Sequence, residues 1–375
     1  MVVSPSPDGA PTQPEMVPTV SSRPGCEVER GSRLNNLSSL QRAERILIDP
    51  ALVDADISGL VASELDEVDR LFRHNLKTPV GIVGEIGEFV NGRPGKRVRP
   101  KLHLLCAQMC GYRGPHAPLL ATVLEFIHSA TLIHDDIIDD ATTRRGRPSV
   151  NAQWGNNLTV LFGDYLLAKA MEMALQAQSL EVMQKLAEVT LRMSEGEMLQ
   201  TRYEGRIDLS REEYLDLIER KTAALFACCC ELAGIVAGVD AERRQALKEF
   251  GHRLGMAFQL VDDLLDFTGD AHTLGKPAAS DLREGKATLA VLDLVSTRDH
   301  RALRLVRRIV EQGKVDGVQF SELRGLLQAS GALDRTRKLA AEYVTGASRC
   351  LAGFPSGAHR SALEALPELL LLRDR

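Results

Sequence analysis

The stretch Leu124–Asp140 reads LEFIHSATLIHDDIIDD, an apolar helical pattern that ends in a group of carboxylates. Asp135 and Asp139 are four residues apart, so a helix projects them from one face, with Asp136 about 100° further round. Neighbouring like charges raise carboxylate pKa values and destabilise the helix unless a cation neutralises them. The stretch therefore predicts a helix that presents oxygen ligands to a divalent metal ion, with a solvated acidic helix end as the alternative.

A second copy of the DDxxD pattern occurs in GMAFQLVDDLLDF, residues 255–267. Gln259, Asp262, Asp263 and Asp266 occupy positions i, i+3, i+4 and i+7 and form one polar stripe on an otherwise apolar helix. Such a stripe predicts a helix that faces a cavity rather than bulk water. Two carboxylate walls favour several metal ions between them, and Mg²⁺ suits hard oxygen ligands that it shares with substrate phosphates.

The chain around these two stretches is helical in pattern from about residue 51 to its end. Aromatic residues make up only 4% of the 375, which favours helices over strands. We expect an all-α fold, a single large antiparallel helical bundle with a central cavity. Residues 52–76, 211–238, 286–296 and 319–348 are each predicted to form one helix. Residues 1–40 are rich in Pro and Ser and predict a flexible tail, and residues 41–375 form the folded domain.

The charge and cysteine content limit the class of protein. A formal net charge of −5 gives no general electrostatic reason to bind nucleic acid. The 7 cysteines include no CxxC pair, so structural zinc and a disulfide framework are not expected. The sequence shows no secretory signal and no apolar run of membrane-spanning length, because Glu231 interrupts the most apolar stretch. A reducing cytoplasmic location is predicted.

Basic residues nevertheless gather in short groups near the two acidic stretches. Each pair alone is typical of a surface, but together they predict a pocket for pyrophosphate groups. His128 lies seven residues before Asp135, two helical turns back on the same face, so it can donate a hydrogen bond to phosphate in the same cavity. The predicted basic groups are Lys96 with Arg99, Arg144 with Arg145, Lys221 beside Thr222, and Lys276.

At these residues the chain resembles the trans-isoprenyl diphosphate synthases, specifically long-chain polyprenyl synthases. The resemblance is carried by GKRVRP, HDDIIDDATTRRGRP, GEMLQ, KTA, GMAFQLVDDLLD, GKP and DLREGKATL, in family order. It implies a prenyltransferase that condenses an allylic diphosphate with successive isopentenyl diphosphate units, with two or three Mg²⁺ ions and a homodimeric assembly. Ala279 departs from a position that is commonly glycine in the family.

The resemblance also implies roles for single residues. Asp135, Asp136, Asp139, Asp262, Asp263 and Asp266 would be the metal ligands. The allylic diphosphate would contact Asp135, Asp139, Arg144, Lys221, Thr222, Gln259, Asp262 and Lys276, of which Asp135, Asp139, Arg144, Lys221, Gln259 and Asp262 are the catalytic set. Isopentenyl diphosphate would contact Lys96, Arg99, His128 and Arg145. No side chain is assigned as the general base.

Chain length depends in this family on the residues just upstream of the first aspartate. Short-chain members usually carry a bulky aromatic residue there, whereas this chain has Ala130 and Thr131. A long all-trans product, a quinone side-chain precursor, is therefore predicted, and Ala130→Phe is expected to shorten it. The alternatives are a farnesyl or geranylgeranyl diphosphate synthase, a terpenoid cyclase or head-to-head synthase, and a non-catalytic partner subunit of a heteromeric prenyl synthase.

Overall fold

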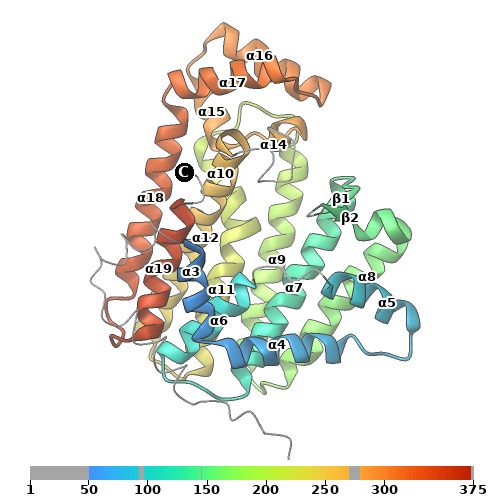
Figure 1. Ribbon diagram of the computed structural model, residues 1–375, viewed down its shortest axis with the longest axis vertical. Coiled ribbons are helices and arrows are strands. Elements are labelled where there is room, and N and C mark those ends of the chain that lie inside the picture. Colours follow the sequence, from blue (N-terminus) through green and yellow to red (C-terminus); the bar gives the residue numbers. More distant parts are fainter. Residues whose placement is uncertain (1–49, 93–96, 145, 270–278, 373–375) are drawn as a thin grey trace, which may run out of the picture.

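The computed structural model describes residues 50–92, 97–144, 146–269 and 279–372. The tail predicted over residues 1–40 lies outside them, so that prediction is not tested. Within the described residues the chain is a bundle of helices with one small hairpin, which confirms the all-α fold (Figure 1).

The secondary structure is given in chain order. The helices are α3 (Pro50–Gly59), α4 (Ala62–Asn75), α5 (Gly81–Asn91), α6 (Val98–Met109), α7 (His116–Ile138), α8 (Val150–Leu175), α9 (Leu180–Tyr203), α10 (Arg211–Ile218), the π-helix η1 (Glu219–Ala223), α11 (Ala224–Val236), α12 (Ala241–Thr268), α14 (Ser280–Arg283), α15 (Leu289–Ser296), α16 (His300–Gln312), α17 (Gly317–Ala329), α18 (Ala332–Cys350) and α19 (Ala358–Leu372); strands β1 (Thr143–Arg144) and β2 (Arg147–Pro148) pair antiparallel.

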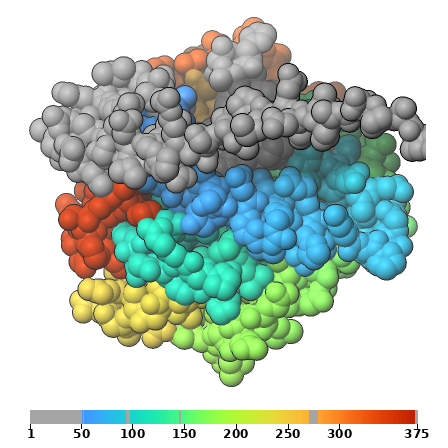
Figure 2. Space-filling model, turned by 60° about the horizontal axis from the view of Figure 1, so that its bottom comes forward, coloured from blue at the N-terminus to red at the C-terminus, as the bar shows by residue number. Residues whose placement is uncertain are grey.

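The centre of the bundle is a set of long helices, each of which packs against the next one across the molecule. Helix α8 packs on α7, α7 on α6, α6 on α11 and α11 on α12, while α9 lies against α11 and η1. Helix α3 contacts the C-terminal helix α19, and Figure 2 shows the C-terminal segment, in red, beside the first described segments, in blue. The largest core cluster joins α4, α6, α7, α8, α9, α11 and α12 beneath these contacts.

The helix starts are local and readable in the sequence. Ser149, Ser179 and Asp240 each accept a hydrogen bond from a backbone N–H of the first turn of α8, α9 and α12. These side chains satisfy donors that have no partner within the helix, which is why Ser and Asp favour this position.

Three predicted helices are divided in the structure. The helix expected over 52–76 is interrupted between Gly59 and Ala62, and the helix expected over 319–348 is interrupted at Gly331, which adopts the left-handed conformation with φ 71°. The segment 211–238 contains the π-helix η1, and the helix expected from 286 begins only at Leu289. One helix among the described residues, α7, is long and apolar enough to cross a membrane, and 67% of its apolar window is buried in this fold.

Candidate active site

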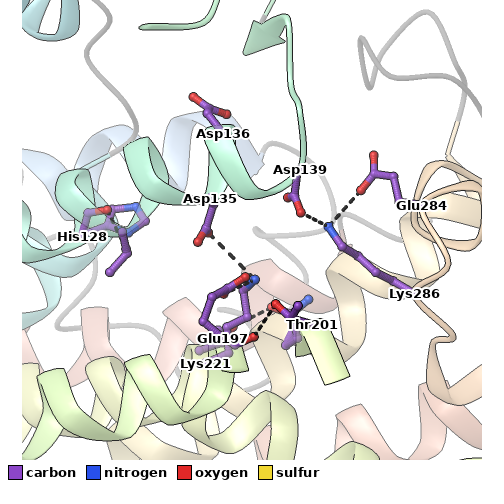
Figure 3. A network of polar contacts seen from close by, with 12 residues as sticks. His128, Asp135, Asp136, Asp139, Glu197, Thr201, Lys221, Glu284 and Lys286 are labelled. Atoms are coloured by element: carbon purple, nitrogen blue, oxygen red, sulfur yellow. Dashed lines mark hydrogen bonds and ion pairs between the residues drawn. The ribbon is translucent and has the colours of Figure 1, made fainter. Parts of the chain in front are cut away.

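The first aspartate cluster lies at the C-terminal end of α7 and faces α9, η1 and the segment that follows α14. The Asp135 Oδ2 atom lies 3.9 Å from Lys221 Nζ on η1. Lys286 Nζ lies 2.9 Å from Asp139 Oδ1 and also 2.9 Å from Glu284 Oε2. Figure 3 shows Asp135 and Asp139 pointing to the same side of α7, as their spacing predicts.

Asp136 belongs to a different face of the helix. Its side chain points away from Asp135 in Figure 3 and is almost fully buried. The Nε–H group of Arg144, on β1, donates a hydrogen bond to Asp136 Oδ1 at 2.6 Å. The predicted ligand set is therefore split: Asp135 and Asp139 face Lys221 and Lys286, whereas Asp136 pairs with Arg144 on another face of the helix.

The electrostatics of Asp135 show what the first cluster lacks. The pKa of Asp135 is raised to about 6, chiefly by burial; the charge of Lys221 opposes this rise, and the carboxylates of Glu197 and Asp139 contribute to it. An additional cation would stabilise the ionised form of these carboxylates, so their oxygens fit a hard divalent ion such as Mg²⁺. Among the residues that the structure describes, no three His, Cys, Asp or Glu side chains close around one point, and the ammonium groups of Lys221 and Lys286 lie against Asp135 and Asp139.

The second cluster lies on α12 and is held by hydrogen bonds. Asp263 is buried and accepts from the Tyr214 hydroxyl and, at 2.7 Å, from Gln259 Nε2. Burial raises the pKa of Asp263 to about 7, although both hydrogen bonds act to lower it. Asp262 is exposed, so it is the member of this cluster that is open to a ligand.

Asp266 closes the turn that leads into α14. Its Oδ1 atom accepts from the backbone N–H and the hydroxyl of Ser280, at 2.8 and 2.9 Å, and its Oδ2 atom from the N–H of Asp281 at 3.1 Å. Ala279, just before this turn, is left-handed with φ 52°. This conformation favours glycine and explains why glycine is common at that position in the family that the sequence resembles.

The π-helix η1 connects the two clusters. A π-helix contains an extra residue per turn and is found mostly at functional sites. Lys221 on η1 approaches Asp135 of the first cluster, and Thr222 donates a hydrogen bond to Gln259 Oε1 at 2.8 Å. Gln259 in turn donates to Asp263, so η1 contacts the first cluster through Lys221 and the second cluster through Thr222 and Gln259.

Arg99 and His128 are also brought together. Arg99 Nη1 lies 3.0 Å from His128 Nε2, and its guanidinium stacks over the Phe226 ring with its carbon 4.8 Å from the ring centroid. Burial lowers the pKa of Arg99. A pocket of about 90 Å³ adjoins His128, and Asp136 and Arg144 help to line it. Lys96, Arg145 and Lys276 lie outside the described residues.

The sequence analysis missed two charged residues at this site. Arg97 lies two residues before Arg99 and has a left-handed backbone with φ 48°. It forms ion pairs with Asp69 at 3.0 Å and with Glu125 at 2.7 Å. Glu197 on α9 lies 2.6 Å from Lys221 Nζ. Both belong to motifs that carry the family resemblance, GKRVRP and GEMLQ, but their ion-pair partners are distant in the sequence, so no local pattern indicates them.

The two positions expected to set chain length differ in exposure. Ala130 has 0% of its surface exposed and lies in the main core, so no open space adjoins it in this structure. Thr131 is partly exposed, and its hydroxyl donates to the His128 carbonyl at 2.9 Å. Because Thr131 precedes Asp135 by four residues, it lies on the same face of α7 as that aspartate.

The chain is similar to known proteins over most of its length. The family model described as Polyprenyl synthetase matches residues 82–323. An octaprenyl diphosphate synthase of Escherichia coli (strain K12) is 35% identical over 85% of this chain and 98% of the relative, and a heptaprenyl diphosphate synthase component 2 of Geobacillus stearothermophilus is 34% identical over 84% and 98%.

Solved structures agree with these matches. The polyprenyl synthase from Caulobacter crescentus CB15, in complex with calcium and isoprenyl diphosphate, superposes with a TM-score of 0.80 at 37% identity, covering 85% of this chain and 97% of that one. The family match, the relatives and the paired aspartate helices lead to one conclusion: this chain belongs to the polyprenyl synthetase family and is a trans-prenyltransferase.

Proposed function

We propose that this protein is a magnesium-dependent synthase that extends an allylic diphosphate with successive isopentenyl diphosphate units to a long all-trans polyprenyl diphosphate. The observation that carries the proposal is the placement of Lys221 and Thr222 between two aspartate clusters. This arrangement puts oxygen ligands and a cation around one space, as a diphosphate leaving group requires.

The reaction breaks the allylic C–O bond, and pyrophosphate leaves with the electron pair. The double bond of isopentenyl diphosphate then attacks the allylic cation, a new C–C bond forms, and a proton is lost. Lys221 and Arg144 would bind the oxygens of the leaving group, and the apolar residues of the bundle core exclude water that would quench the cation. No covalent nucleophile is required.

The residues of the two clusters fit Mg²⁺. When bound by Asp135, Asp139 and Asp262, two or three such ions would neutralise the charge that grows on the leaving pyrophosphate. The polyprenyl synthase from Caulobacter crescentus was solved with calcium, another hard divalent ion, and isoprenyl diphosphate. Asp263 and Asp266 would support the site through their hydrogen bonds with Tyr214 and Ser280.

The isopentenyl diphosphate would occupy a separate subsite beside the allylic one. Arg99 and His128, in contact at 3.0 Å, would supply its described part, and Lys96 and Arg145 would complete it. The allylic diphosphate would contact the aspartates of both clusters with Arg144, Lys221, Thr222, Gln259 and Lys276.

The product is proposed to be long because α7 carries Thr131 rather than a bulky aromatic residue one turn before Asp135. Both relatives described above are named for long products, octaprenyl and heptaprenyl diphosphate. Thr131→Phe should therefore shorten the product, which thin-layer chromatography of the dephosphorylated prenols would detect. Ala130→Phe is the matched control: because Ala130 is packed in the core, the larger ring should lower the melting temperature instead.

We also propose that two copies associate through α8 and α9. The apolar helix α11 is unsuited to this role, because residues such as Phe226 and Leu232 are buried within the chain. Leu161 on α8 and Leu191 and Met198 on α9 are 63%, 62% and 71% exposed. An apolar face of this kind is typical of an interface.

Light scattering after size-exclusion chromatography tests this assembly. The unchanged protein should have the mass of a dimer, and the double substitution Leu161→Glu with Leu191→Glu should halve it. Val318→Glu on α17, where the side chain is 78% exposed, should leave the dimer intact. A monomeric unchanged protein would contradict the proposed interface.

The decisive assay for the function supplies farnesyl diphosphate and excess isopentenyl diphosphate with Mg²⁺ and identifies the product by mass spectrometry. A long polyprenyl diphosphate is expected. A product that stops at geranylgeranyl would support the short-chain alternative, and turnover without isopentenyl diphosphate would support a cyclase. No turnover by the purified chain would support a partner-subunit role, as the name of the component 2 relative suggests for that protein.

A cytoplasmic location, proposed from the reduced cysteines, is tested by cell fractionation.

A further inference from the structure

The motif GEMLQ lies on α9 opposite the π-helix, and its contacts go beyond what the reaction assigns to it. Successive residues of η1 each pair with a side chain of α9: Glu219 with Arg192 at 2.6 Å, Arg220 with Glu195 at 2.5 Å, and Lys221 with Glu197 at 2.6 Å. In an α-helix consecutive side chains diverge by about 100°, so an unbroken row toward one neighbour is unusual. Here the row includes the π-helical segment, and the long side chains of both helices reach one another across it.

Gly196 allows α9 and η1 to approach this closely. A Cβ atom at Gly196 would lie 2.8 Å from the backbone nitrogen of Lys221 and 3.1 Å from its Cα. These contacts are with main chain, which cannot rotate away as a side chain could. The glycine therefore brings α9 against the backbone of Lys221, directly beside Glu197.

The Glu197 carboxylate has a single cationic contact among the described residues. Its Oε2 atom meets Lys221 Nζ at 2.6 Å, and its Oε1 atom is buried without a hydrogen bond in that part of the chain. Lys221 is much nearer to Glu197 than to Asp135, from which it is separated by 3.9 Å. Figure 3 shows the lysine held between the two carboxylates.

We infer that Glu197 is a positioning residue, which holds the Lys221 ammonium short of Asp135 and aims it at the diphosphate of the allylic substrate. Without the carboxylate, Lys221 is free to close on Asp135, where it would occupy the place of a metal ion and leave the diphosphate. This inference rests on the proposed function and deepens it, because it names a residue that acts through Lys221 without touching the substrate.

The test uses Glu197→Gln, which removes the charge and keeps the shape. The KM for the allylic diphosphate should rise roughly tenfold, as expected for a misplaced charged hydrogen-bond partner, while the KM for isopentenyl diphosphate stays within about twofold. Glu195→Gln is the matched control: it removes a carboxylate of α9 that pairs with Arg220 rather than Lys221, so both KM values should stay unchanged.

A double-mutant cycle separates positioning from a general structural role. If Glu197 acts through Lys221, then Glu197→Gln should have no further effect on KM in a Lys221→Ala protein. With Lys221 present, Glu197→Asp should raise the KM for the allylic diphosphate less than Glu197→Gln does, because it keeps the charge. Additive losses, or equal effects of Glu195→Gln and Glu197→Gln, would overturn the inference. If Glu197→Gln does not fold, Glu197→Asp in both backgrounds gives the same cycle.

A binding measurement distinguishes this inference from the proposed function. Calorimetric titration of each variant with inorganic pyrophosphate in Mg²⁺ needs no turnover. Weaker pyrophosphate binding by Glu197→Gln, absent in the Lys221→Ala background, supports the positioning role even if the unchanged protein makes no prenyl product. Unchanged pyrophosphate binding by Glu197→Gln contradicts it even if the enzyme is active.

Discussion

The two aspartate clusters have the same DDxxD spacing but different kinds of partner. Asp135 and Asp139 face Lys221 and Lys286, long side chains with flexible stems whose charge a metal ion can replace. Asp263 and Asp266 instead accept hydrogen bonds from a tyrosine, a glutamine and backbone N–H groups. In the first cluster a metal ion can therefore replace the lysine ammonium groups, whereas in the second cluster two of the three carboxylates are already bound in hydrogen bonds within the protein.

This difference teaches that a repeated motif need not carry a repeated role. In the first cluster Asp135 and Asp139 face two lysine side chains, and Asp136 is paired on another face of the helix with Arg144. In the second, Asp262 is the exposed member. We therefore expect substitutions in the first cluster to affect catalysis and substitutions at Asp263 to affect stability.

The largest effect is expected at Asp139. Asp139→Asn should lower kcat about 10³-fold, because it removes a charge that would hold the metal ions at the leaving group. Asp140→Asn is the control: Asp140 is exposed and left-handed with φ 47°, a conformation that asparagine also tolerates, so activity should be unchanged. Steady-state kinetics with Mg²⁺ measure both. Equal losses in the two variants would show that the acidic helix end acts only through its general charge.

Asp262→Asn should have the next largest effect, a fall in kcat of about 10²-fold with no change in melting temperature. Its side chain is exposed, so no packing is lost when the charge is removed. Activity titrated against Mg²⁺ should need a higher concentration for half-maximal rate. An unchanged Mg²⁺ requirement would remove the second cluster from the set of proposed metal ligands.

Asp263→Asn should mainly lower stability, by about 1–3 kcal/mol. Both oxygens of Asp263 accept hydrogen bonds, and the amide of asparagine would direct its own N–H groups at one of the donors. Thermal unfolding in a chelator measures the loss, and Tyr214→Phe in the same chain should reduce it because one donor is then removed. A variant with unchanged stability and a raised Mg²⁺ requirement would identify Asp263 as a metal ligand instead.

The sequence predicted the local part of this arrangement and missed the part that depends on distant partners. The 3.6-residue period was sufficient to place Asp135 and Asp139 on one face and to predict the helices that carry both clusters. The partner of Asp263, however, is Tyr214, 49 residues earlier in the chain, and no local pattern indicates that hydrogen bond. The π-helix is missed for the same reason: its register is set by Gly196 and the ion pairs with α9.

The two clusters should also give the metal-free protein an unusual dependence of stability on pH. Burial raises the pKa of Asp135 to about 6 and that of Asp263 to about 7, above the ordinary value of 3.8 that the unfolded chain retains. The folded state then binds more protons than the unfolded state, so the contribution is fully present below pH 3.8 and is lost as pH rises through 6 to 7.

Melting temperatures in a chelator at several pH values measure this dependence. The loss toward pH 7 should amount to a few degrees, and Mg²⁺ with pyrophosphate should remove the part due to Asp135. Asp263→Asn should remove the other part whether or not metal is present. If saturating metal abolishes the whole dependence, both clusters exchange their partners for metal and the contrast between them is wrong.

The smallest effect is expected at Ala279, which precedes the turn held by Asp266. A left-handed φ of 52° costs an alanine about 1 kcal/mol relative to glycine, and glycine loses part of that gain through its greater freedom in the unfolded chain. Ala279→Gly should therefore raise the free energy of unfolding by about 0.5 kcal/mol.

Gln178→Gly is the control, at an exposed left-handed residue after α8 with φ 49°, and it should raise the free energy of unfolding by a similar amount far from the site. Activity should be unchanged in both, because Asp266 binds the N–H groups of Ser280 and Asp281, whose positions glycine at 279 leaves intact. A loss of activity confined to Ala279→Gly would mean that the second cluster depends on a rigid turn as well as on its hydrogen bonds.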